Sequence, residues 1–189
     1  VGTVWGVQAT LDFAIGGHPR RNSTPVVLHK LLERALPSQT GFAHAVRANM
    51  LDVIERCVAK GMPVESSTLV LAQSAEMVEL LLSAHCDVNA TSEGVPVFLG
   101  CCYFGSIEAV RQMVKCGARA DVRDALGNTA LHYASSEAMS SFLLGHCMLA
   151  VESRNARGET ALFIQERCSR NRSSVLQILV QRGLDVNAR

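Results

Sequence analysis

The chain has 189 residues, of which 48% are hydrophobic and 19% are charged, a balance that excludes a chain disordered by composition. Its 18 basic and 17 acidic residues leave a formal net charge of +1. This excludes a purely electrostatic nucleic-acid binder, which needs a large positive excess, and no run approaches the roughly 18 apolar residues of a membrane span.

The first 37 residues are predicted to form two helices. Apolar residues recur at helical spacing from Val4 to Ile15 and indicate the first one. The second is expected to begin at Pro25, because Ser23 and Thr24 precede it and proline favours the first helical position. We interpret residues 1–37 as an N-terminal cap or a decayed repeat. The chain starts without Met, so we expect a processed chain or a fragment.

A unit of two short helices is predicted between residues 41 and 61. Its internal step of 12 residues, from Asn49 to Gly61, recurs between Gly105 and Gly117. Gly117 is expected to end a helix, because a glycine just beyond the last turn adopts the left-handed conformation easily. The 12-residue step therefore marks the second helix of each unit.

A fixed period runs through the rest of the chain. Gly94, Gly127 and Gly158 are separated by 33 and 31 residues, and a matching short run follows each of them. By contrast, the steps from Thr40 to Thr68 and from Thr68 to Pro96 are only 28 residues. The unit around Thr68 is therefore predicted to be shortened in its turn and its first helix.

The repeated runs resemble ankyrin repeats. Thr129-Ala-Leu-His-Tyr-Ala134 is similar to the family motif T-P-L-H-x-A and departs from it at Ala130. Asp87-Val-Asn-Ala90 is similar to the end of the family's G-A-D-V-N-A. The resemblance covers residues 38–189 and implies an all-α, ankyrin-repeat solenoid of stacked antiparallel helix pairs with projecting turns. It implies about five irregular repeats, the last incomplete, which must stack because one pair cannot bury its apolar face alone.

The resemblance implies a protein–protein interaction module, such as a scaffold or adaptor, with another protein as partner. It implies no enzyme and no cofactor. Two alternatives stay open, which are a structural subunit of a large assembly such as a ribonucleoprotein and the regulatory arm of a larger enzyme. We also found no nucleotide-binding loop and no nucleophile or metalloprotease motif in the sequence.

Partner-binding residues can be carried over from the family, which binds through its turn tips and the exposed face of each first helix. The expected contacts are Arg47, Glu93, Val95, Tyr103, Phe104, Leu126, Asn128, Arg157, Glu159 and Arg167, and the same comparison adds Ser135 and Ser136. Tyr103 and Phe104 stand out in a chain with 5% aromatic residues. They are expected to form a binding hot spot, or else to fill a gap left by the shortened repeat beside them.

Histidines and cysteines are predicted to be structural. His132 matches the motif histidine, which in this family holds neighbouring turns together by hydrogen bonds. Cys101 and Cys102 fall where the family has alanines, so they are expected to be buried. A zinc site shared by the His85-Cys86 and His146-Cys147 pairs is not expected, because these lie two repeats apart. Seven cysteines without a CxxC motif favour a reducing compartment, the cytoplasm or an organelle matrix.

Two features keep more than one interpretation. The densest basic stretch carries Arg167, Arg170 and Arg172, and is expected to be a solvated loop, with a contact to RNA phosphates or to an acidic protein patch as alternatives. Asn89 and Asn187 match the position at which asparagine is hydroxylated in some ankyrin proteins, and the sequence leaves that modification open.

Overall fold

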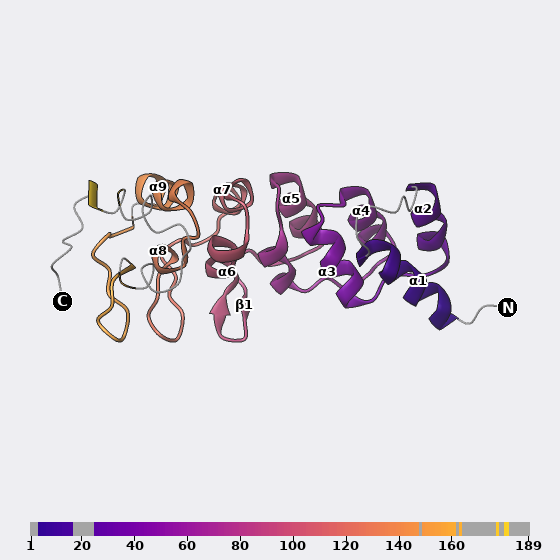
Figure 1. The fold of residues 1–189 in the computed structure, drawn as a ribbon, viewed down its shortest axis with the longest axis horizontal. Coiled ribbons are helices and arrows are strands. Elements are labelled where there is room, and N and C mark those ends of the chain that lie inside the picture. The colour runs from indigo at the N-terminus through magenta and orange to yellow at the C-terminus, as the bar shows by residue number, and fades with distance from the viewer. Residues whose placement is uncertain are drawn as a thin grey trace.

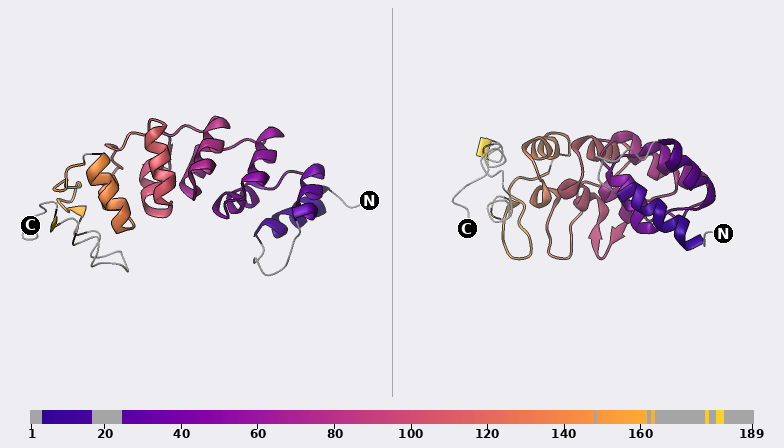
Figure 2. Two further views of the ribbon diagram at one scale, coloured as in Figure 1. Left: turned by 90° about the horizontal axis from the view of Figure 1, so that it is seen from above. Right: turned by 45° about the vertical axis from the view of Figure 1, so that its right-hand side comes forward.

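The structure is a computed structural model that describes residues 4–16, 25–147 and 149–161 and the single residues 163, 177, 180 and 181. Short helices stack side by side in a curved row that runs from the N-terminus to the C-terminus (Figures 1 and 2). Turns project from one side of the row in its C-terminal half (Figure 1). The all-α repeat solenoid predicted from the sequence is confirmed.

The described elements follow one another in a regular order. They are α1 (Val4–Gly16), α2 (Pro25–Arg34), α3 (Gln39–Arg47), α4 (Leu51–Ala59), the 3-10 helix η1 (Ser66–Leu71), α5 (Ala75–Ser83), β1 (Thr91–Ser92), β2 (Val95–Pro96), α6 (Val97–Phe104), α7 (Ile107–Lys115), α8 (Ala130–Tyr133) and α9 (Glu137–His146).

The helices form two rows. The first helices of the units, α3, η1, α6 and α8, pack in this order, and the second helices include α4, α5, α7 and α9, with α5 packed on α7. Gly100 allows the close approach of α6 to η1, because a Cβ there would lie 2.9 Å from a methyl group of Val70. The two rows enclose a continuous apolar core, so each unit supports its neighbours.

The second helices begin and end with short-range hydrogen bonds that their sequences supply. Ser74, Ser106 and Ser136 each accept a hydrogen bond from the backbone N–H three residues later, which stabilises the helix start. Gly117 follows α7 with a φ of 91°, and the Gly117 and Ala118 N–H groups donate back to the carbonyls of the last turn. This is the helix end predicted at Gly117.

The shortened unit around Thr68 is confirmed, since its first helix is the six-residue 3-10 helix η1. One other expectation was wrong. Ser136 does not lie on a first-helix face, because its hydroxyl caps α9, which limits α8 to four residues.

The N-terminal segment contacts the first unit directly. α1 and α2 occur where the sequence predicted helices, and α1 packs against α3. The Asp12 carboxylate of α1 accepts a hydrogen bond of 2.9 Å from Ser38 N–H at the start of α3. None of the described helices is long and apolar enough to cross a membrane.

Candidate functional site

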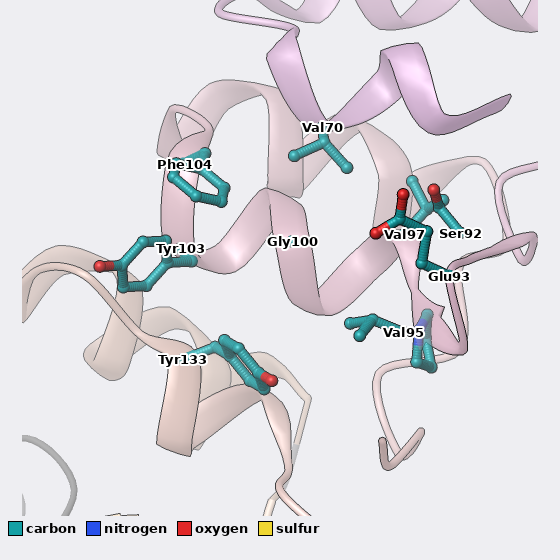
Figure 3. A pocket seen from close by; sticks show the side chains of 10 residues that line it. Val70, Ser92, Glu93, Val95, Val97, Gly100, Tyr103, Phe104 and Tyr133 are labelled. Carbon is teal, nitrogen blue, oxygen red and sulfur yellow. The ribbon is translucent and has the colours of Figure 1, made fainter. Parts of the chain in front are cut away.

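A groove of about 410 Å³ opens on the side of the projecting turns, between η1, the β1–β2 turn, α6 and α8. Figure 3 shows Tyr103, Phe104 and Tyr133 at one end of this groove and Glu93 with Ser92 at the other, with Gly100 of α6 between them. The remaining lining residues are Val70, Val95, Pro96 and Val97. The surface is therefore mainly apolar, with one carboxylate at its end.

Two exposed aromatic rings mark the mouth of the groove. Tyr103 is 48% exposed and Phe104 is 64% exposed, although both belong to α6. Their ring centroids are 4.5 Å apart in an edge-to-face arrangement, which is a favourable geometry for aromatic pairs. Phe104 therefore does not fill the gap beside the shortened repeat, and of the two roles left open by the sequence its exposure fits the interface role.

The short helix α8 explains this exposure and adds a third ring. α8 ends at Tyr133, so it has no further turn to cover the C-terminal end of α6. The Tyr133 ring stands 6.5 Å from that of Tyr103 and nearly perpendicular to it. Tyr133 was not predicted as a site residue, because it occupies the unspecified position of the ankyrin motif.

Tyr133 is held in place by Asp124 of the turn that precedes α8. Its hydroxyl donates a hydrogen bond of 2.7 Å to Asp124 Oδ2. Burial, and then this hydrogen bond, raise the pKa of Tyr133 to about 12. Burial alone would raise the pKa of Asp124, but hydrogen bonds from Tyr133, Asn128 and Leu126 outweigh it and hold the pKa below its ordinary value. The pair thus consists of a neutral phenol and an ionised carboxylate at neutral pH.

Glu93 occupies an uncommon backbone conformation at the other end of the groove. Ser92 pairs with Val95 in the β1–β2 ladder, which leaves Glu93 and Gly94 as a two-residue turn. The φ angles of these two residues are 52° and 79°, as a type I′ turn requires. Asparagine or aspartate is usual at the first of these positions, so a glutamate there carries backbone strain.

The next two turns are braced by side chains. Asp124 Oδ1 accepts hydrogen bonds from the Leu126 and Asn128 N–H groups, and Asn155 Oδ1 accepts the equivalent pair from Arg157 and Glu159.

The braced turns are also joined to each other. Asn155 Nδ2 donates to Asn128 Oδ1 at 2.9 Å, the Arg123 guanidinium donates to Arg154 O at 3.1 Å, and Ala156 N–H donates to Leu126 O at 2.8 Å. The two turns therefore form one rigid pair.

His132 links α8 to the last described turn. Its Nδ1 accepts a hydrogen bond of 3.1 Å from Thr129 N–H, and its Nε2 lies 3.1 Å from Glu159 O. The first bond makes Nδ1 the acceptor, so Nε2 carries the proton and donates a hydrogen bond to the Glu159 carbonyl. Burial lowers the pKa of His132 below its ordinary value. The structural role predicted for this histidine is confirmed.

Comparison with known proteins also identifies ankyrin repeats in this chain. Residues 98–189 match the family model of ankyrin repeats in three copies. Residues 98–189 are therefore ankyrin repeats. Ankyrin repeats are in general protein–protein interaction modules. A search of curated proteins gives no match to this chain, so the repeats themselves carry the argument about function.

The family resemblance placed partner contacts at ten residues, and the structure separates these ankyrin positions into groups. Glu93, Val95, Tyr103 and Phe104 come together around the groove. Leu126 and Arg157 are exposed at the tips of the next two turns, whereas Arg47 is exposed on α3, beyond η1. Arg167, and with it Arg170, Arg172 and Asn187, lies outside the described residues.

The expected role of Asn128 is corrected by the structure. It was expected to contact a partner, but only 9% of it is exposed, and its amide bonds to Asp124 and to Asn155. Glu159 is half-buried and accepts a hydrogen bond of 3.0 Å from Asn155 Nδ2. The family's variable position is thus used at Asn128 to brace the turns. Asn89 similarly bridges two turns, since its amide donates to Gly117 O and accepts from Arg119 N–H.

Four cysteines, Cys57, Cys86, Cys101 and Cys102, are buried, whereas Cys116 is exposed. Cys101 and Cys102 are fully buried, as predicted. Burial raises the pKa of the Cys101 thiol to about 12 and those of Cys57 and Cys86 to about 11. Within the described part of the chain no group of three or more potential ligands could hold a metal ion.

Proposed function

We propose that the protein is a non-catalytic scaffold or adaptor that binds a partner protein on the face of the projecting turns, with Tyr103 and Phe104 at the centre of the contact. The observation that carries the proposal is the exposure of these two rings, 48% and 64%, at the mouth of a groove. Large aromatic side chains next to a concave apolar surface are typical of binding hot spots, where each contributes about 2 kcal/mol or more.

The turn tips extend the proposed contact beyond the groove. Glu93, Leu126 and Arg157 each precede the glycine of a projecting turn, so they repeat at the same position along the row. They present a carboxylate, an apolar side chain and a guanidinium. A partner that follows the tips would meet a changing chemistry, which favours one orientation and one partner over others.

The rigidity of the stack supports a binding role, and the free cysteines favour a reducing compartment. The braced turns and shared core hold the surface in one shape before a partner arrives, which lowers the entropy cost of binding. Cys57, Cys86, Cys101 and Cys102 are free and buried. We infer that the protein works in the cytoplasm or an organelle matrix, where thiols stay reduced.

The experiment that tests the proposal is partner capture from native extract with three forms of the chain. The first is unaltered, the second is the double variant Tyr103→Ala/Phe104→Ala, and the third is Phe13→Ala. Phe13 is a matched control, because it is 78% exposed but lies on α1, far from the groove. We expect the double variant to capture at least about tenfold less of a specific partner than the unaltered chain does. Phe13→Ala should capture the same amount as the unaltered chain. Circular dichroism checks that each variant is folded, and equal capture by all three would overturn the proposal.

A further inference from the structure

The groove contains one charged group among its ten lining residues, the carboxylate of Glu93. Among the described residues no cation pairs with this carboxylate, and the two described ion pairs, His29–Asp52 and Arg119–Asp121, lie elsewhere. Figure 3 shows the Glu93 side chain turned toward Gly100, into the groove. An unpaired acid on the rim of an apolar groove attracts a positively charged group.

The backbone conformation of Glu93 differs from that of the residues at the equivalent position of the next two turns. Leu126 and Arg157 take the same place in the next two turns, yet among the described non-glycine residues only Asn49, His85 and Glu93 have a positive φ. The left-handed conformation is unfavourable for a glutamate, because its Cβ crowds the backbone. The carboxylate of Glu93 is turned toward Gly100 of α6 (Figure 3).

The aromatic end of the groove complements this acid. Tyr103 and Tyr133 stand nearly perpendicular to each other, and the surface between them and Glu93 is formed by Val95, Val97 and Gly100. This surface offers apolar contact at one end and negative charge at the other. An extended segment, whose alternate side chains point to the same side, can use both ends.

Resting on the proposed function, we propose that the groove binds an extended segment of the partner with a lysine or arginine at Glu93 and an apolar side chain against Tyr103 and Phe104. The methylene stem of the basic residue packs on Val95 and Pro96, and its charged head reaches the Glu93 carboxylate. The groove thus selects for a basic residue next to an apolar one, and selects against acidic segments.

The chain offers a selective probe of the groove. It has two tyrosines, Tyr103 and Tyr133, and both line the groove. Fluorine NMR of fluorotyrosine-labelled protein therefore reports on this site alone. Random peptides displayed on phage are first selected on the unaltered chain, on Glu93→Gln and on Tyr103→Ala/Phe104→Ala. The best peptide is then titrated with its basic residue intact or replaced by norleucine, which keeps the stem and removes the charge.

Peptides selected on the unaltered chain are expected to share a lysine or arginine at one position, and peptides selected on Glu93→Gln to lack that preference. Norleucine should weaken binding to the unaltered chain about fivefold and leave binding to Glu93→Gln nearly unchanged. An apolar or acidic residue at that position, or the same basic preference on Glu93→Gln, would overturn this inference and leave the proposed function standing. If no selected peptide depends on Tyr103 and Phe104, the proposed function fails first.

Discussion

The β1–β2 turn and the two turns that follow it project from the same side of the stack, but different forces hold them. In the second and third turns, Asp124 and Asn155 each accept hydrogen bonds from backbone N–H groups of their own turn. Asn155 also donates a hydrogen bond to Asn128 of the turn before it. The first turn has Thr91 in the place of Asp124, and it closes instead through two residues with positive φ.

This difference indicates that the second and third turns support the fold, whereas the first turn presents a side chain for binding. The side chains of Asp124, Asn128 and Asn155 in the second and third turns are committed to hydrogen bonds inside the protein, and Asn128 is buried. In the first turn, Glu93 is exposed and, among the described residues, has no partner. The first turn, which is closed by the β1–β2 pair and not by an Asp or Asn side chain, is therefore the one that presents a charged side chain to the groove, as strained positions at functional sites often do.

Removing the brace should have the largest effect. Asp124→Ala takes away the acceptor of hydrogen bonds from Leu126, Asn128 and Tyr133, and we expect it to lower the free energy of unfolding by about 2–3 kcal/mol. Thr91→Ala is the matched control in the first turn and should cost less than about 0.5 kcal/mol. Urea unfolding followed by circular dichroism measures both. Equal losses would mean that the three turns are held alike.

An intermediate effect is expected at His132, which joins α8 to the third turn. Its folded-state pKa is lowered by burial, so the unfolded chain binds the proton more readily. Stability should accordingly fall as the pH drops below about 6.5, the ordinary pKa of histidine. His132→Gln should cost about 1–2 kcal/mol at neutral pH and make the unfolding free energy less dependent on pH between neutral and mildly acidic conditions. An unchanged dependence in this variant would show that another group titrates.

The smallest effect is a gain in stability at Glu93. Glu93→Asn places the residue preferred in a type I′ turn at the strained position, and it should raise the free energy of unfolding by about 0.5–1 kcal/mol while weakening capture of basic peptides. Leu126→Asn is the control, since Leu126 does not have a positive φ, and it should give no gain. A loss of stability in Glu93→Asn would contradict the assignment of strain to this residue.

Much of the fold could be predicted because its signals are local. The 33- and 31-residue steps between glycines and the helix end at Gly117 each depend on a few neighbouring residues. The role of His132 could be predicted because a family motif includes it. The first helix of the Thr68 unit could be predicted to be short, because two successive steps of 28 residues leave no room for a longer one.

The site could be predicted only in part, because its shape depends on contacts between units. Ser136 could cap α9 or extend α8, and only packing decides that α8 stops at Tyr133 and exposes Tyr103 and Phe104. Asn128 was expected at the surface because its position varies in the family, but its role depends on Asn155 in the next repeat. The positive φ of Glu93 follows from strand register, which a single turn sequence does not determine.

The most direct test of the binding surface is partner capture by Tyr103→Ala/Phe104→Ala beside Phe13→Ala, with both variants shown to be folded. We predict that the groove variant captures at least about tenfold less of one specific partner than the unaltered chain does. The α1 variant, which removes an even more exposed ring, should capture as much as the unaltered chain. Equal retention by both variants, or an equal loss in both, would contradict the claim that the partner binds where α6 is left uncovered by the short helix α8.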